Sequence, residues 1–555
     1  METMTGAELT VALLERQGIR HLAGMPGGTN LPLYDALGRS RIHSILARHE
    51  QGAGFIAQGM ARASGQPAVC LATSGPGATN LLTALADAKL DSIPIVCITG
   101  QVPIPLIGTD AFQEVDICAM SQPVTKQSIQ VRSVKALLSV IPDAFALAMS
   151  GRPGPVLIDI PKDVQLASIE VDAWPEPGRA VPPLCANANV IDTAAQKIIA
   201  AQRPILYLGG GVIHADAGDL AMELAQRCDL PTVMTLMALG VMPQHHSLSL
   251  GMLGMHGAAA TNHALHQCDL LITIGARFDD RATGKLEAFC PDAEVIHLDI
   301  DAREIHKLRR ADVPLAGDAR ATLAQLLERL PPLEHPHWQA TIADIKTRHP
   351  EPNWPTQLNT PQGLIKAVAE RLGPDALVTT DVGQHQMWTA QLYPFLRPRQ
   401  FLTSGGLGTM GFGLPAAIGA ALAEPERTVV CFSGDGSILL NLQELATAAD
   451  LPLNIKVVVM NNGGLGLVRQ QQDLFYRGQR VSSTLRNPDF CQLAEGFGWS
   501  TQDLSDADNA LSCLHTALDT PGLQLIHAPI DSDARVYPMV PPGHANHQML
   551  VAEPV

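Results

Sequence analysis

The sequence predicts an α/β fold with three domains, each built on a mainly parallel sheet flanked by helices. Short apolar runs that end in Gly, Ser, Asp or Asn recur along the 555 residues, and helical patterns of ten or more residues separate most of them. This alternation is typical of βα units and parallel sheets. The chain is also too long for a single hydrophobic core.

Two proline-rich segments, residues 170–189 and 331–361, interrupt the alternation. Both are typical of linkers, the second with one short helix, and they predict domains at residues 1–165, 190–330 and 362–550. The first and last domains share a scheme of strand, Gly/Ser loop and helix, which suggests an ancient duplication.

The strands are expected where apolar residues follow one another without interruption, because strands of parallel sheets are buried on both faces. The first domain offers "PAVCLAT", "IPIVCIT" and "GPVLIDI". The middle domain offers "RPILYL", "DLLITI" and "AEVIHLDI", and the last offers "RTVVCFS" and "NIKVVVM".

Composition and charge restrict the partners and the compartment. Charged residues make up only 17% of the chain, so we expect much of its surface to be buried against a second copy. The net charge of -16 argues against nucleic acids and anionic membranes as partners. The chain has no run of 18 apolar residues, no signal-peptide pattern and no C-x-x-C pair among its ten cysteines. We therefore expect a cytoplasmic protein with reduced thiols.

One strand–helix–strand unit of the last domain carries a candidate metal site. Asp435 follows the strand "RTVVCFS", a helix is expected over residues 438–449, and Asn462 lies just beyond the strand "NIKVVVM". A right-handed crossover brings both loops to the same edge of a parallel sheet. Mg²⁺ prefers a few oxygen ligands and accepts phosphate and water for the rest. The predicted ligands are Asp435, Asn462 and a backbone carbonyl near Gly464.

The glycines around Asp435 indicate what this metal would anchor. Gly434 and Gly436 let the backbone approach a diphosphate, and the amides of Gly436 and Ser437 open the helix that would face it. A second glycine motif, "GLGTMG" at residues 406–411, matches the dinucleotide fingerprint and alone would predict a nicotinamide dehydrogenase. An acid that binds ribose needs no asparagine partner, so the pairing of Asp435 with Asn462 argues against that interpretation.

The "GDGS" motif and the asparagine after the next strand resemble the thiamine diphosphate (ThDP) motif, and a resemblance to one family then extends over nearly the whole chain. The chain is similar to the catalytic subunits of bacterial acetohydroxyacid synthases (acetolactate synthases). The segments that carry this resemblance are "PGGTNLPLYDAL", "ARHEQGAGFIAQGMARASG", "TSGPGATN", "GTDAFQEVD", "GRPGPVLIDIPKD", "LGMLGMHG", "GARFDDR", "TTDVGQHQMW", "GLGTMGFGLPAAIGA" and "YPMVPPG".

The resemblance implies an enzyme that decarboxylates pyruvate and transfers the two-carbon unit to a second 2-keto acid. Pyruvate as acceptor gives 2-acetolactate and 2-ketobutyrate gives 2-aceto-2-hydroxybutyrate, in the first common step of branched-chain amino acid synthesis. The implied cofactors are ThDP, Mg²⁺ and FAD. The three domains would bind the ThDP pyrimidine, the FAD and the ThDP diphosphate, in chain order. A small regulatory subunit is an expected partner.

The family assigns roles around ThDP to residues of this chain. Glu50 would hydrogen-bond the aminopyrimidine, and Met410 would be the apolar wedge that folds the cofactor. Glu50 and Asp435 would come from different subunits, which implies a homodimer or larger assembly. The full set expected to contact ThDP is Glu50, Val382, Gly383, Gln384, His385, Gly408, Met410, Gly434, Asp435, Gly436, Ser437 and Asn462.

Other residues match family positions that line the substrate channel: Gly28, Phe112, Gln113 and Lys126. The bland alternative for Lys126 is a solvated surface lysine. Gln471 replaces a tryptophan found in many relatives, and a tryptophan there favours the longer side chain of 2-ketobutyrate. We therefore expect this chain to make relatively more acetolactate. The segment "VYPMVPPG" resembles the part of the chain that closes over the site.

The middle domain ends its strands on close-approach glycines, which alone indicate a nucleotide site of some kind. The family implies FAD, bound without net redox chemistry. The matching residues are Arg152, Gly209, Gly210, Gly211, Leu253, Gly254, Met255, His256, Gly275, Ala276, Arg277, Asp279, Arg281, Asp299, Ile300 and Asp318.

Several alternatives stay open at this point. They are a flavin-free catabolic acetolactate synthase, an FAD-dependent pyruvate oxidase, a glyoxylate carboligase and a non-catalytic nucleotide-binding regulator. The "RFDDR" segment argues against the first, because the flavin-free enzymes depart from it. Glyoxylate carboligase lacks the glutamate found here at position 50. Intact Glu50, Asp435 and Asn462 argue against the regulator.

Overall fold

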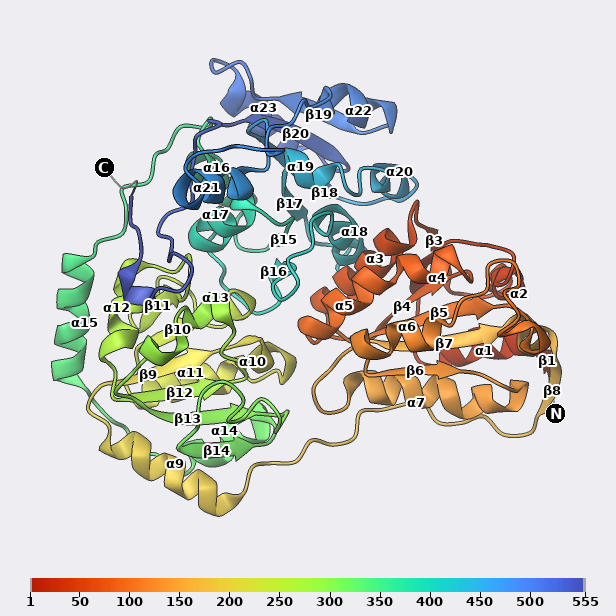
Figure 1. The fold of residues 1–555 in the computed structure, drawn as a ribbon, viewed down its shortest axis with the longest axis horizontal. Coiled ribbons are helices and arrows are strands. Elements are labelled where there is room, and N and C mark those ends of the chain that lie inside the picture. Colours follow the sequence, from red (N-terminus) through yellow and green to blue (C-terminus); the bar gives the residue numbers. More distant parts are fainter. Residues whose placement is uncertain (1, 553–555) are drawn as a thin grey trace.

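Three six-stranded parallel sheets, each covered by helices, form the molecule (Figure 1). The structure is a computed structural model that describes residues 2–552. The predicted fold class, three domains with mainly parallel sheets flanked by helices, is confirmed. Among residues 2–552, every helix is too short or too polar to cross a lipid bilayer.

The first domain has the strand order β3-β2-β4-β5-β7-β6. A separate antiparallel pair, β1 (Glu2–Thr5) with β8 (Ser168–Val171), joins the start of this domain to its end. Its other strands are β2 (His21–Gly24), β3 (His43–Leu46), β4 (Ala68–Ala72), β5 (Ile95–Gln101), β6 (Gln127–Gln130) and β7 (Val156–Pro161). Its helices are α1 (Gly6–Arg16), α2 (Leu31–Leu37), α3 (Glu50–Ser64), α4 (Pro76–Asn80), α5 (Leu82–Leu90), α6 (Ile117–Ser121), α7 (Leu137–Met149) and α8 (Lys162–Leu166).

The last domain repeats this arrangement, with the order β16-β15-β17-β18-β20-β19. Numbered along each domain, both sheets run 2-1-3-4-6-5, which supports the duplication that the sequence suggests. Its strands are β15 (Leu377–Thr380), β16 (Phe401–Leu402), β17 (Val429–Gly434), β18 (Ile455–Asn461), β19 (Ser500–Asp503) and β20 (Gln524–Pro529). Its helices are α16 (Pro361–Leu372), α17 (Gln384–Leu392), α18 (Gly413–Ala423), α19 (Asp435–Ile438), α20 (Glu444–Ala449), α21 (Gly466–Phe475), α22 (Phe490–Gly496) and α23 (Ala510–Asp519).

The middle domain has a different order, β11-β10-β9-β12-β13-β14. Numbered along the domain it runs 3-2-1-4-5-6, the order of dinucleotide-binding sheets, whose ligands lie where the order reverses. Its strands are β9 (Pro204–Leu208), β10 (Thr232–Met234), β11 (Ser249–Met252), β12 (Leu270–Ile274), β13 (Glu294–Asp299) and β14 (Val313–Ala316). Its helices are α9 (Ala188–Ala200), α10 (Gly210–His214), α11 (Gly218–Arg227), α12 (Ala259–Gln267), α13 (Asp280–Thr283), α14 (Ala319–Leu327) and α15 (Pro336–Arg348).

Helix α3 of the first domain packs against helix α18 of the last domain (Figure 1). They approach so closely that a Cβ on Gly59 would lie 2.2 Å from the Ala416 carbonyl oxygen. A Cβ on Gly419 would lie 2.0 Å from the Ile56 carbonyl oxygen. Glycine is required at both positions, because any side chain would push the helices apart. One hydrophobic core runs through this contact from one domain into the other.

Three local features differ from the sequence predictions. The helix expected over residues 438–449 is two short helices, α19 and α20, with a turn at Asn441 whose side-chain amide bonds the Gly411 carbonyl at 2.6 Å. Helix α15 packs on the middle domain, where the Trp338 indole donates to the Pro204 carbonyl at 3.0 Å, so that domain extends beyond residue 330. The C-terminal segment, residues 534–550, leaves the last domain and reaches the middle one.

Candidate active site

Asp435, Asn462 and Gly464 lie together at the carboxyl edge of the last sheet. Strand β17 ends at Gly434, and its neighbour β18 is in register with it through the pair Gly434 and Met460. The Gly464 amide donates to the Asp435 carboxylate at 2.9 Å and to the Asn462 side-chain oxygen at 3.2 Å. The strand order therefore brings together the three residues predicted to hold a metal, while their role as ligands stays a prediction.

The Asp435 carboxylate is buried, with 2% of the residue exposed, and it receives only neutral donors. Besides the Gly464 amide, the Asn487 side chain donates to it at 2.6 Å. Burial raises the pKa of Asp435, although these hydrogen bonds partly oppose the shift. Within residues 2–552 no Lys, Arg or His forms an ion pair with this carboxylate. A divalent cation would supply the missing positive charge, so the residues present fit Mg²⁺.

The residues predicted beside the diphosphate pack around Asp435. The Ser437 hydroxyl donates to the Val382 carbonyl at 2.9 Å. A Cβ on Gly434 would lie 2.8 Å from Nδ1 of His385, and one on Gly436 would lie 3.8 Å from the Met410 methyl group. The structure thus places the wedge candidate Met410 beside the glycine loop.

His385 is a further sign that this space accepts a polar ligand. Burial lowers the pKa of His385 to about 3, so its ring is neutral near pH 7. Its Nε2 is buried and has no hydrogen-bond partner within the described part of the chain. Buried polar atoms are rarely left unpaired, so a bound group is expected there.

Gln384 connects the candidate metal site to helix α21 and to the C-terminal segment. Its side-chain oxygen accepts from the Asn462 amide at 3.2 Å. Its side-chain nitrogen donates to the Gln470 oxygen at 3.1 Å and to the Ala534 carbonyl at 2.9 Å. A change in the position of residues 534–550 would therefore reach Asn462 through one side chain.

Glu50 starts helix α3 in the first domain and is 8% exposed. Its carboxylate accepts from the Asn80 side chain at 2.9 Å. A Cβ on Gly77 would lie 3.1 Å from the same carboxylate. Within the described residues of one chain, no hydrogen bond or ion pair joins Glu50 to the cluster around Asp435.

The predicted channel residues do not form one cluster. Phe112 is 88% exposed, and Gln113 has a φ of 59° with its Cα close to Gly75. Gly28 is exposed. The Lys126 ammonium donates to the carbonyls of Leu147 and Ser150, both at 2.6 Å, so it caps the end of α7 instead of standing free in solvent. Burial lowers the pKa of Lys126 to about 8. The substrate role of all four stays a prediction.

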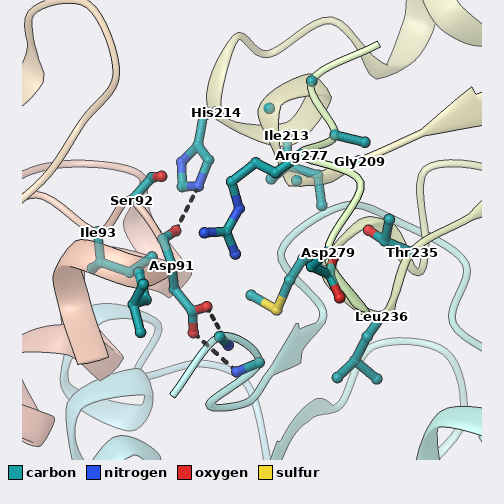
Figure 2. A pocket seen from close by; sticks show the side chains of 18 of the residues that line it. Asp91, Ser92, Ile93, Gly209, Ile213, His214, Thr235, Leu236, Arg277 and Asp279 are labelled. Carbon is teal, nitrogen blue, oxygen red and sulfur yellow. Dashed lines mark hydrogen bonds between the residues drawn. The ribbon is translucent and has the colours of Figure 1, made fainter. Parts of the chain in front are cut away.

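A cavity of about 880 Å³ lies at the switch point of the middle sheet, between the three domains (Figure 2). Fifteen of the sixteen residues predicted to bind FAD line it, and Gly254 does not. The same cavity is lined by Val382, Gly408 and Gln471, so the space for the nucleotide continues toward the candidate ThDP site.

The cavity wall fits a nucleotide. Gly211 and Gly275, which follow β9 and β12, line the cavity with their backbones packed together, since a Cβ on Gly211 would lie 2.6 Å from the Gly275 Cα. Arg277 extends into the cavity in Figure 2 and has no hydrogen bond or ion pair within residues 2–552. A half-buried guanidinium without a partner suits an anionic or carbonyl-rich ligand. The residues present therefore fit FAD, and their individual contacts stay predictions.

Two contributors to these sites were not predicted from the sequence. Asn487 donates to Asp435 and also to the Asn461 side-chain oxygen at 2.9 Å, but it comes from a loop with no motif. Asp91 lines the cavity and bonds the loop that carries Gly408. A charged residue within the helical run "LLTALADAKLDS" was the available signal for Asp91.

Three protein-family models match the chain, one on each domain. They are the thiamine pyrophosphate enzyme N-terminal TPP binding domain at residues 4–120, the central domain at residues 191–326 and the C-terminal TPP binding domain at residues 381–528. The matches cover most of the three sheets.

Curated relatives resemble the chain over nearly its whole length. It is 55% identical to the acetolactate synthase isozyme 1 large subunit of Escherichia coli, over 98% of this chain and 97% of the relative. It is 48% identical to the isozyme 2 large subunit of the same organism, over 99% of each chain. It is 45% identical to the acetolactate synthase large subunit of Corynebacterium glutamicum, over 99% of this chain and 91% of the relative.

Proposed function

Because this chain belongs to the acetolactate synthase large subunits, within the thiamine pyrophosphate enzymes, we propose that it decarboxylates pyruvate and joins the two-carbon unit to a second 2-keto acid. The products are 2-acetolactate from pyruvate and 2-aceto-2-hydroxybutyrate from 2-ketobutyrate, in branched-chain amino acid biosynthesis. The observation that carries this proposal is the Asp435 carboxylate beside Asn462 at the edge of the last sheet, which is buried and has no ion-pair partner within residues 2–552.

ThDP, Mg²⁺ and FAD are the cofactors of this family. Asp435, Asn462 and Gly464 would hold Mg²⁺, while His385, Gly436 and Ser437 would face the diphosphate. When bound, ThDP supplies a stabilised carbanion for breaking and making carbon–carbon bonds. Met410 would support the cofactor from its apolar side.

The protein's own part in this chemistry is to orient groups and to exclude water. Glu50 would share its proton with the ring nitrogen of the aminopyrimidine and so favour the imino tautomer, a role that suits a buried carboxyl group. Residues 534–550, fixed by Gln384 and Gln470, would cover the site and keep it dry. The FAD would fill the cavity of the middle domain without net redox chemistry.

The assembly and the location are further parts of the proposal. The relatives are named large subunits, which supports a small regulatory subunit as partner. A homodimer or larger assembly would bring Glu50 of one copy to Asp435 of another. The ten cysteines are free thiols, which suits the reducing cytoplasm.

The test is an assay of the purified protein on pyruvate, with acetolactate measured as acetoin and with ThDP, Mg²⁺ and FAD omitted in turn. We expect a yellow protein whose colour pyruvate does not permanently bleach, and loss of activity without ThDP or Mg²⁺. Lasting bleaching would indicate a pyruvate oxidase. Full activity in flavin-free protein would indicate the catabolic type of enzyme.

A further inference from the structure

A buried cluster of charged residues lies where the three domains meet. Arg62 on α3 forms ion pairs with Asp87 at 3.2 Å and with Asp91 at 2.8 Å. Asp87 lies on α5, and Asp91 follows directly after it. The exposed fractions of Arg62, Asp87 and Asp91 are 6%, 0% and 6%. The first domain therefore buries two carboxylates against one guanidinium, an arrangement that hydrophobic residues could replace without loss of stability.

The other hydrogen bonds of this cluster go to a loop of the last domain, residues 404–409. The two oxygens of Asp91 accept from the amides of Gly405 at 3.0 Å and Gly406 at 2.7 Å, as the dashed lines from Asp91 in Figure 2 show. Asp87 accepts from the hydroxyl of Thr409 at 2.8 Å and from the hydroxyl of Ser404. This set of bonds fixes both ends of the loop.

Arg62 and the middle domain make the remaining contacts of this cluster. Arg62 donates to the Thr403 carbonyl at 2.9 Å, just before the loop, and its guanidinium lies 5.0 Å from the centre of the Phe412 ring, just after it. The His214 ring, on α10, lies 3.2 Å from the Asp91 carbonyl oxygen, the other dashed line in Figure 2. Asp91 thus touches the first domain's own helix, the loop and the middle domain.

The loop needs an external support because of its sequence. Residues 404–409 read "SGGLGT", and three glycines in six residues give the backbone more conformational freedom than residues with a Cβ would. Gly405 and Gly406 have no side chain that could anchor the loop, so only their backbone groups can be held, and Asp91 binds their amides. The loop lines the cavity and leads directly to Met410, which lies beside Gly436.

We propose that Arg62, Asp87 and Asp91 are positioning residues that hold the loop of residues 404–409, and with it Gly408 and Met410, in the conformation that receives ThDP. This inference rests on the proposed function, because that function assigns Gly408 and Met410 to the cofactor. The support is transmitted across a domain boundary, from α3 and α5 to the last domain. Burial and the neighbouring Asp91 raise the pKa of Asp87 to about 6, which agrees with an excess of negative charge at this junction.

The test compares Asp91→Asn with the wild type in two measurements on apoprotein. Hydrogen exchange of the peptide that covers residues 404–410 should become faster, because the amides of Gly405 and Gly406 lose a charged acceptor. The dissociation constant for ThDP with Mg²⁺, measured by calorimetry, should rise about 10- to 100-fold, the usual worth of a charge-assisted hydrogen bond. The turnover number at saturating ThDP should stay within about threefold of wild type, so that the loss appears in affinity.

A matched control removes a different buried carboxylate. Asp159 is 0% exposed and receives hydrogen bonds from Thr99 and Gln101 within the first domain, with none to the loop. Asp159→Asn should leave loop exchange and ThDP affinity at wild-type values even where it lowers the melting temperature. If Asp91→Asn behaves like Asp159→Asn in both measurements, the cluster only fills the core and the proposal is wrong.

A second variant keeps the test decisive where Asp91→Asn fails to fold. Thr409→Val preserves the shape of the side chain and removes the hydroxyl that donates to Asp87. It should accelerate exchange over residues 404–410 and weaken ThDP binding about threefold or more. Unchanged ThDP affinity in this variant overturns the proposal. Failure of the wild-type protein itself to bind ThDP would instead overturn the proposed function.

Discussion

Two consecutive glutamines on α21 face different surroundings, one in a structural contact and the other in the cavity wall. Gln470 is 1% exposed, and it exchanges two hydrogen bonds of 2.9 Å with the backbone of Val536. Gln471 is half-buried and lines the cavity, and its side chain has no hydrogen bond within the described residues. A substitution at Gln471 can therefore change the cavity wall without releasing the C-terminal segment.

Gln471→Trp should shift the acceptor preference toward 2-ketobutyrate. The indole would offer apolar contact to the extra methylene of that substrate, which is worth roughly 1–3 kcal/mol in a closed pocket. We expect the ratio of 2-aceto-2-hydroxybutyrate to acetolactate to rise about tenfold in a competition assay with both acceptors. Gln471→Leu is the control for apolarity without the ring. A wild-type protein that already prefers 2-ketobutyrate strongly would contradict the role of Gln471.

At the scale of elements, the C-terminal segment of residues 534–550 is a strap between two domains. It crosses from α21 to the middle domain, where the Val540 amide donates to the Met255 carbonyl at 2.9 Å. The Asn546 side chain donates to the Ala282 carbonyl at 2.8 Å, and the His256 ring lies 3.0 Å from the Pro538 carbonyl oxygen. Two of these contacts involve residues predicted to bind FAD, so the strap covers the cavity's edge.

Four histidines meet where the short helix η6 (Asn546–Gln548) of the strap docks on α12. The His263 and His349 rings stack with their centres 3.9 Å apart, and His266 and His547 are also 3.9 Å apart. Arg348 is a further cation near these rings, and it forms an ion pair with Asp344 at 2.7 Å. Burial, followed by the other three histidines and Arg348, lowers the pKa of His263 to about 4.

Acid should loosen the strap. Well above pH 6.5 the His263 ring is neutral with the strap docked or released, so its contribution to docking does not change with pH. As the pH falls from about 6.5 toward 4, His263 takes up a proton more readily when the strap is released, because release reduces the burial that lowers its pKa. Protonation therefore favours the released state, and docking weakens. We expect faster hydrogen exchange over residues 536–550 at pH 5 than at pH 7.5, after correction for the intrinsic rate.

The histidine cluster can be tested by removing its charge change. His547→Gln keeps a side chain that can hydrogen-bond but cannot become cationic, so it should reduce the acid-induced loosening. His515→Gln on α23 is the control outside the cluster. Equal loosening in wild type and His547→Gln would assign the effect to other groups, His256 first among them, because burial lowers the pKa of His256 to about 4.

At this scale, the features that could be predicted are those determined by residues close together in the sequence. The strands β17 and β18 are continuous buried runs, so their parallel pairing and the approach of Asp435 to Asn462 followed from sequence. The break between α19 and α20 did not, because it is set by Asn441 bonding a carbonyl thirty residues away. Asn487 and the contacts of Asp87 and Asp91 arise in the same way, from partners distant in the chain.

At the scale of the whole molecule, we propose that a second copy of the chain completes each site. Glu50 and Asp435 have separate sets of contacts, although α3 and α18 lock their domains together. Several large apolar side chains of the first and last domains are also exposed in one chain, among them Phe112, Leu440 and Tyr476. A second copy that covers such side chains and brings its own Glu50 to the Asp435 cluster would account for both observations.

Mixed dimers should therefore recover activity from two inactive variants. Glu50→Gln alone should lower turnover about 10²- to 10⁴-fold, the usual worth of acid–base assistance, and Asp435→Asn should prevent Mg²⁺-dependent binding of ThDP. Co-expressed with different tags and purified on both, the two variants form dimers in which each site takes Glu50 from one copy and Asp435 from the other. One site of the two is then intact, so we expect about half of wild-type activity.

The reciprocal pairing makes the result unambiguous. A chain carrying both Glu50→Gln and Asp435→Asn, co-purified with a wild-type chain, has one defect in each shared site and should be nearly inactive. If each chain instead built its site alone, the outcomes would exchange: the double variant with wild type would keep about half of the activity, and the two single variants together would keep almost none. That exchange of outcomes would show that the site is not shared between two copies.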